Sequence, residues 1–182
     1  GHVNELMQSG VNTFVEPIVA DYLGGTSDGV SYAIIPDKGV LSIPMFTGSQ
    51  TAGFGGYLES QDVIDGEMVR YDRWFAIGQG DMGSAVDAAL EATGRPTGRI
   101  EGWVVERSTG VALPNVHVFA YRPGEAGPWV EWTTDVGDDP SPDGSFGGNL
   151  PPGHWELVVH AEGRPTGPRV PVTISKGQQV NV

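Results

Sequence analysis

The densest set of candidate metal ligands is a loop that contains four aspartates within nine residues, Asp135, Asp138, Asp139 and Asp143. Calcium takes six to eight oxygen ligands, and the carboxylates and carbonyls of one loop can supply them. The spacing does not match the pattern D-x-[DN]-x-[DN]-G, and Pro140 and Pro142 stiffen the segment. The loop therefore has two interpretations, a calcium site or, as the pattern favours, a solvated hairpin insertion.

A second motif, Gly78-Gln-Gly80-Asp-Met-Gly83, has G-x-G-x-x-G spacing between a predicted strand and a predicted helix. In a dinucleotide fold these glycines let the backbone approach a pyrophosphate at the helix N-terminus. Here Asp81 places a carboxylate where the phosphate would lie, and the preceding strand carries Arg70 and Asp72 on one face. Because the pattern beyond Glu106 is that of an antiparallel sandwich, the motif is interpreted as a tight turn that caps a packing helix.

The histidines and serines give no assignable catalytic set. The histidines are His2, His117, His154 and His160, and alternation puts the last three on outer faces of predicted strands. A zinc site needs three or four ligands that converge at about 2 Å, which this spacing does not require. The chain has no Gly-x-Ser-x-Gly elbow for a Ser-His-Asp triad. A carboxylate pair for general acid–base chemistry stays open, since an acidic chain offers many pairs and none stands out.

Period-2 alternation of apolar and polar residues, bounded by Gly, Pro, Asp and Asn, predicts antiparallel strands through most of the chain. The predicted strands are Val30–Ile35 and Val40–Phe46, taken as a hairpin, then Met68–Ile77, Gly102–Glu106, Val116–Tyr121 and Trp155–Ala161. One helix is predicted over Met82–Ala92, with Asp81 as N-cap and Gly94 just beyond its end. The sequence thus predicts an all-β fold of two packed antiparallel β-sandwich modules, residues 1–97 and 98–182, with one short α-helix near the junction.

The same alternation predicts exposed aromatic residues on the second module. Trp103 is predicted to face outward, with Phe119 and Tyr121 beside it on one sheet. Such a patch is either covered by another domain or binds a flat ligand, and packing against the first module is the favoured interpretation. The alternative is carbohydrate binding, because aromatic faces stack on sugar rings. Trp129 and Trp132, from the Gly/Pro-rich segment before the acidic loop, would extend that platform.

The overall charge argues against some partners. The 182 residues include 10 Lys+Arg and 23 Asp+Glu, for a formal net charge of −13, so nucleic acid and anionic membrane surfaces are repelled. No stretch approaches the ~18 apolar residues of a membrane span, and we expect no membrane insertion. The 0 cysteines rule out disulfides and thiolate metal sites. Since the chain opens Gly1-His2 with no signal peptide, we expect a piece of a longer protein whose export signal lies elsewhere.

A run of landmarks spans the second module in a fixed order. It comprises Gly98-Arg-Ile100-Glu-Gly102-Trp-Val104, Thr109-Gly110, Pro114-Asn-Val116, Thr134-Asp135, Asp143-Gly-Ser-Phe146 and Leu150-Pro-Pro-Gly153-His-Trp155. This run resembles the carboxypeptidase regulatory-like, transthyretin-like domain, except that Val136 to Pro142 is inserted before the Asp-Gly-x-Phe turn. The resemblance implies a sandwich of about seven strands that is non-catalytic and fused to enzymes or surface proteins. It does not imply peptidase activity, because in that family the domain lies beside the peptidase.

The first module carries two further motifs, Asp28-Gly-Val30-Ser-Tyr32 and Arg70-Tyr-Asp-Arg-Trp74-Phe-Ala-Ile-Gly78, followed by the short helix. They resemble a β-sandwich region of large exported bacterial proteins that often also carry a metal-dependent phosphoesterase domain of the polymerase-and-histidinol-phosphatase (PHP) type. The resemblance implies that any hydrolase chemistry lies in another part of the parent protein. It also implies an extracytoplasmic location, whether secreted, periplasmic or at the cell surface.

From these patterns we expect a non-catalytic accessory or scaffolding module whose partners are other domains of its parent chain. Calcium at the acidic loop is the one cofactor considered. Two alternatives remain open. One is a carbohydrate-binding module that uses the exposed aromatics, and the other is a hydrolase in its own right.

Overall fold

The computed structural model describes residues 18–27, 29–43, 45–47, 52–54, 64–68, 70, 72–135 and 142–182. The chain forms two compact units, the described parts of Gly1–Leu23 with Ile34–Trp74 and those of Gly24–Ala33 with Phe75–Val182. Over the described residues there are fourteen strands and a single helix. The predicted all-β fold with one short helix is therefore confirmed, and the helix belongs to the same unit as the strands that follow it.

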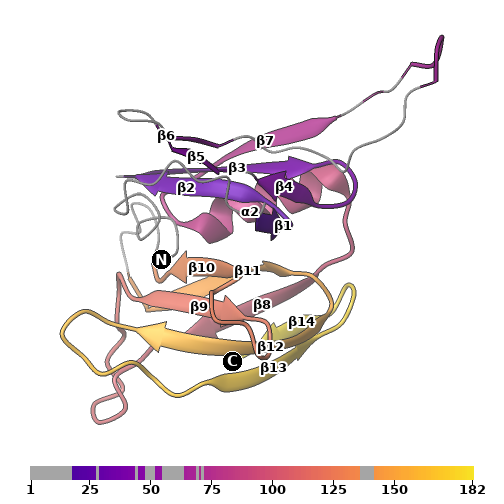
Figure 1. The fold of residues 1–182 in the computed structure, drawn as a ribbon. Helices are drawn as coiled ribbons and strands as arrows, with labels where there is room; N and C mark the ends of the chain where they lie inside the picture. Colours follow the sequence, from indigo (N-terminus) through magenta and orange to yellow (C-terminus); the bar gives the residue numbers. More distant parts are fainter. Residues whose placement is uncertain are drawn as a thin grey trace. The chain divides into compact units, whose positions relative to one another are not determined.

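Residues 98–182 form a seven-stranded sandwich of two sheets (Figure 1). The four-stranded sheet has the order β10-β9-β12-β13, and the three-stranded sheet has the order β11-β8-β14. Strand β14 runs parallel to β8, whereas the other pairs are antiparallel. The bounds are β8 (Gly98–Trp103), β9 (His117–Tyr121), β10 (Val130–Thr133), β11 (Ser145–Leu150), β12 (Gly153–His160), β13 (Val170–Ile174) and β14 (Gln179–Asn181).

Alternate residues of these strands point into the space between the two sheets. Ile100 on β8 and Val118 on β9 are fully buried, and so is Trp155 on β12. On β8 and β9, Trp103 and His117 face solvent, so the predicted inside–outside alternation is confirmed there. On β12 it fails at one position, because Val158, predicted to face outward, is buried. Burying one such aliphatic side chain stabilises the fold by about 1.5–3 kcal/mol.

A separate three-stranded sheet contains β2 (Leu23–Ser27), β3 (Val30–Pro36) and β7 (Arg73–Gly78), with β3 in the middle. Because β2 and β7 occupy both edges of β3, the predicted hairpin between Val30–Ile35 and Val40–Phe46 is wrong. Strand β7 begins at Arg73, later than the predicted strand from Met68, and Val69 and Tyr71 lie outside the described residues.

The first unit contains two short antiparallel pairs. Strand β4 (Leu41–Ile43) pairs with β1 (Ile18–Ala20), and β5 (Met45–Thr47) pairs with β6 (Ala52–Phe54). The predicted strand Val40–Phe46 thus corresponds to β4 and the start of β5, each paired with a different segment.

Helix α2 (Met82–Thr93) begins at the predicted residue and ends one residue later than the predicted Ala92, with Gly94 just beyond it as expected. The carboxylate of Asp81 accepts a hydrogen bond from the Ser84 amide at 2.9 Å, and Gly94 ends the helix with φ 62°. Its buried residues are Gly83, Ala85, Val86, Ala89 and Leu90. This face packs on β10 and β11, which are edge strands of different sheets.

The G-x-G-x-x-G motif lies in the turn between β7 and α2. A dinucleotide fold requires the strands before and after the helix to be parallel members of one sheet. Here β7 and β8 belong to different sheets, and Gly80 adopts a φ of 113° that favours glycine. The interpretation as a tight turn that caps the helix is consistent with this arrangement.

Trp132 lies where the helix meets the two sheet edges. Its side chain is 1% exposed, and two glycines make room for the indole ring. A Cβ added at Gly83 would lie 2.0 Å from Trp132 Cδ1, and one at Gly148 would lie 2.1 Å from Nε1. Both glycines are therefore required by packing, although neither has a positive φ.

We predict that Gly83→Ala destabilises the fold by roughly 1–3 kcal/mol, because the added methyl group overlaps Trp132. This loss exceeds the ~1 kcal/mol that alanine gains over glycine inside a helix. The measurement is the free energy of unfolding in urea. Gly127→Ala is the control, since a Cβ at Gly127 meets no atom within 4 Å. Equal stability of Gly83→Ala and the wild type would contradict the packing.

Candidate functional site: a polar groove beside the helix

A groove of about 430 Å³ lies along the outer face of β8 and β11. Alternation along β8 places the side chains of Arg99, Glu101 and Trp103 on this face, and the Arg99 Nε lies 2.7 Å from Glu101 Oε1. In the antiparallel register Gly147 of β11 is opposite Glu101, and Ser145 is opposite Trp103. A Cβ added at Gly147 would lie 3.3 Å from Glu101 Cγ, so the Glu101 side chain takes the space that a side chain at Gly147 would need.

Trp103 supplies the apolar part of the groove. The residue is 53% exposed, although its ring lies among polar residues of β8, β11 and the acidic loop. An indole face offers a large rigid surface for stacking, at a small cost in conformational entropy. The groove therefore combines one flat apolar surface with donors and acceptors around it.

The carboxylates of the acidic loop hold the end of the groove together. Asp135, at φ 52°, accepts hydrogen bonds from the amides of Asp143 at 3.0 Å and Gly144 at 2.9 Å. Asp143 in turn accepts one from the Ser145 amide at 2.9 Å. The side chain of Ser145, followed by its amide, holds the pKa of the Asp143 carboxyl below its ordinary value, with a smaller contribution from Trp103. These bonds fix the turn into β11.

The calcium hypothesis is only partly covered by the structure. Asp138 and Asp139 lie outside the described residues. Among the residues that are described, no group of three or more His, Asp or Glu side chains is placed to hold a metal ion. The carboxylate of Asp135 already accepts hydrogen bonds from the Gly144 amide. Calcium binding at this loop stays a prediction, and calorimetric titration with calcium would test it.

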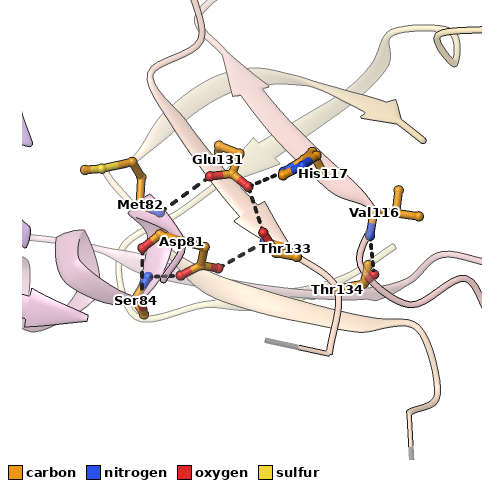
Figure 2. Close-up of polar contacts among 8 residues, drawn as sticks. All are labelled: Asp81, Met82, Ser84, Val116, His117, Glu131, Thr133 and Thr134. Atoms are coloured by element: carbon orange, nitrogen blue, oxygen red, sulfur yellow. Dashed lines mark hydrogen bonds and ion pairs between the residues drawn. The ribbon is translucent and has the colours of Figure 1, made fainter. Parts of the chain in front are cut away.

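Asp81 connects the helix to the sandwich at the other end of the groove (Figure 2). It is 2% exposed, and its second oxygen accepts a hydrogen bond from the amide of Thr133 on β10 at 3.0 Å. Glu131 of the same strand accepts from the Thr133 hydroxyl at 2.9 Å and lies 2.7 Å from the His117 ring. Two carboxylates thus lie beside the positive end of the helix dipole, where negative charge is stabilised.

Asp87 makes the equivalent connection to the other sheet. Its carboxylate accepts a hydrogen bond from the amide of Asn149 on β11 at 2.7 Å. Burial raises the pKa of Asp87 to about 6, against the opposing effects of the Asn149 bond and of Arg99. Asp81 and Asp87, six positions apart on one helix, therefore each accept a backbone amide from the edge of a different sheet.

The aromatic residues singled out from the sequence do not form one surface. Phe119 and Tyr121 lie on β9, in the four-stranded sheet, whereas Trp103 lies on β8 in the other sheet. The prediction that the three share one sheet is wrong, because β8 and β9 are joined by a loop that crosses between the sheets. Arg169 lies 4.6 Å from the Tyr121 ring, and the His117 ring is stacked on Phe119 at 6.1 Å.

The prediction that Trp132 forms an exposed aromatic platform together with Trp129 is also wrong. The sequence interpretation placed Trp132 in the Gly/Pro-rich segment, as part of an exposed platform, but it belongs to β10 and points inward under helix α2. Trp129 is partly buried and packs edge-on against Trp155 at 5.3 Å. Among the five aromatics, only Trp103 therefore faces the groove.

The sequence did not single out Arg99 and Glu101 as residues of the groove, or Asp87 as a residue that contacts the edge strand β11. Alternation along β8 was a usable signal for the first two, because both share the parity of Trp103. Asp87 carried no such signal, since its contact with Asn149 joins residues that are far apart in the chain.

Comparison of the chain with protein-family models, curated proteins and solved structures gave no significant match. The helix in the described part of the chain is too short and not apolar enough to cross a bilayer.

We predict that Asp87→Asn raises the stability at neutral pH and flattens its pH dependence. A carboxyl whose pKa is higher in the folded chain stabilises it below the unfolded pKa and loses that contribution as pH rises through the folded value. The contribution of Asp87 is therefore fully present below pH 3.8 and is lost as the pH rises from 3.8 to about 6, so that above this range its charge destabilises the fold. The effect, on the order of 2 kcal/mol, is measured from unfolding midpoints across this range.

Glu106→Gln provides a control of opposite sign. The Arg164 hydrogen bond lowers the pKa of Glu106, so its stabilising contribution is present above the unfolded pKa and lost in acid. If Asp87→Asn and the wild type lose stability in parallel between acid and neutral pH, the assigned role of Asp87 is wrong.

Proposed function

We propose that this chain is a non-catalytic accessory module of a larger exported bacterial protein, similar to the carboxypeptidase regulatory-like domains. The order of landmarks after Gly98 and the seven-stranded sandwich support this assignment. Its location is extracytoplasmic, and other domains of the parent chain are its first partners. The parent carries any metal-dependent hydrolase chemistry.

The observation that carries the proposal is the hydrogen bonding of the carboxylates in the groove. The carboxylate oxygens of Asp81 and Asp135 accept hydrogen bonds from backbone amides of the helix, of β10 and of the turn before β11. A general base needs a lone pair directed at its substrate. Groups held in structural hydrogen bonds favour a binding surface over a hydrolytic centre.

Carbohydrate binding is the second candidate, and Trp103 favours it. A half-exposed indole beside Arg99, Glu101 and Ser145 offers one stacking surface with donors and acceptors at its margin. The surrounding acidic residues disfavour polyanionic polymers. The ligand of this groove would therefore be a neutral glycan.

We predict that neutral soluble polysaccharides retard the chain in affinity electrophoresis and that Trp103→Ala abolishes the retardation. Loss of one stacked ring is expected to weaken binding by about 1–3 kcal/mol, roughly five- to 150-fold in affinity. Trp74→Ala is the matched control, because Trp74 is 42% exposed and belongs to the other unit. Unchanged migration of the wild type over a panel of polysaccharides would reject the carbohydrate candidate.

The non-catalytic assignment has its own test. Purified chain, supplied with divalent metal ions, is incubated with a panel of phosphoesterase substrates. The expected result is no turnover above buffer. Turnover that is lost in a groove variant such as Glu101→Gln would establish the hydrolase alternative.

A further inference from the structure

A second cavity lies within the sandwich, and it differs in character from the polar groove. It has a volume of about 360 Å³, and its lining combines inward-facing residues of both sheets with the exposed Trp103 and Val105. The aliphatic lining includes Val104, Val118, Leu157, Val159 and Val170. Apolar cavities of this kind stay dry and take up apolar ligands, since water gains no hydrogen bonds inside them.

Two side chains that alternation predicts to be buried in the core are only partly buried. Val159 and Ala161 have inward parity on the segment that contains β12, but both remain partly exposed because the cavity opens beside them. The segment that follows, with Arg164 and Pro165, forms the mouth. The cavity is therefore reachable from solvent, and it has the size of a small-molecule site.

Charge at the mouth indicates which end of a ligand would lie there. Among the described residues that line the cavity, Arg164 is the only one with a charged side chain. Its Nη1 donates to Glu106 Oε1 at 2.7 Å, which fixes the guanidinium beside the opening. A guanidinium carries five N–H donors, so one ion pair leaves donors that can bind a second carboxylate.

We propose that this cavity binds a medium-chain aliphatic carboxylate, with its hydrocarbon tail between the sheets and its carboxylate on Arg164. An apolar cavity of ~150 Å³ holds a six-carbon ring. By that ratio, the volume of about 360 Å³ takes roughly 14 heavy atoms, which corresponds to a chain of about eight to twelve carbons. Trp103 and Phe146 line both this cavity and the polar groove, but carboxylate binding does not require the groove to bind a glycan.

The test is calorimetric titration of the full chain with decanoate at neutral pH, below its micelle concentration. We expect saturable binding, and octanoate should bind roughly fifteenfold more weakly, since each of the two missing methylenes accounts for about fourfold in affinity. Decyltrimethylammonium has a tail of similar length with the opposite charge and should bind much more weakly. Equal binding of decanoate and decyltrimethylammonium, or no heat with decanoate at millimolar concentration, would overturn the proposal.

Two arginine variants test the head-group contact. Arg164→Gln should weaken decanoate binding about tenfold, because a charge-assisted hydrogen bond is lost. Arg169→Gln is the matched control: the Arg169 side chain is 47% exposed, against 46% for Arg164, and is likewise paired with a glutamate, Glu156. If both variants weaken binding equally, or neither does, the carboxylate does not bind at Arg164.

A cavity-filling variant tests the location of the tail. Ala161→Trp places an indole in the opening and should abolish decanoate binding while circular dichroism shows a folded chain. Binding that persists in the folded variant would place the ligand elsewhere. If the variant does not fold, the chain-length comparison and the arginine pair still decide between support and rejection.

Discussion

The structure around the groove depends on how the open edges of the sandwich are closed. Strands β10 and β11 are edges of different sheets, and an edge presents unpaired amides that can recruit another chain. Helix α2 lies across both edges. Asp81 accepts the Thr133 amide of β10, and Asp87 accepts the Asn149 amide of β11. One helix thus satisfies donors of two sheets with side-chain carboxylates, where a further strand would use backbone carbonyls.

This closure has a cost that packing offsets. Trp132 Nε1 is buried, and it has no hydrogen-bond partner among the described residues. An unsatisfied buried donor costs about 1–3 kcal/mol, and the charge on partly buried Asp87 adds to that cost at neutral pH. Against this, the indole of Trp132 fills the junction so tightly that Gly83 and Gly148 admit no side chain. Burial of so large a ring contributes several kcal/mol, so the helix remains docked.

Local rules in the sequence predicted the elements whose causes are local. Asp81 and Gly94 mark the ends of the helix because capping depends on residues within one turn. Alternation predicted which residues of β8 and β9 face inward, because successive side chains of any strand alternate. In each case the physical cause lies within a few residues of the position that was predicted.

Errors arose where strand pairing, and not local pattern, decides the outcome. The hairpin after Val30–Ile35 was wrong because β2 and β7 take both edges of β3, which no pattern in the strand itself reveals. Strand β10 is four residues long and follows Gly/Pro-rich sequence, so no strand was predicted there and Trp132 was expected in an exposed platform. The same strand shows an alternation, Val130 and Trp132 inward with Glu131 and Thr133 less buried, that could have revealed it. The groove itself required the register of β8 against β11.

The two cavities follow from an asymmetry between the edges of the sandwich. At β10 and β11 the helix and Trp132 fill the space between the sheets. Val170 of β13 and Val182 beyond β14 belong to the opposite edges, and both line the apolar cavity. Aliphatic side chains there are too short to close the gap that an indole closes at the other side. The apolar cavity therefore reaches the pair of edges that the helix does not cover.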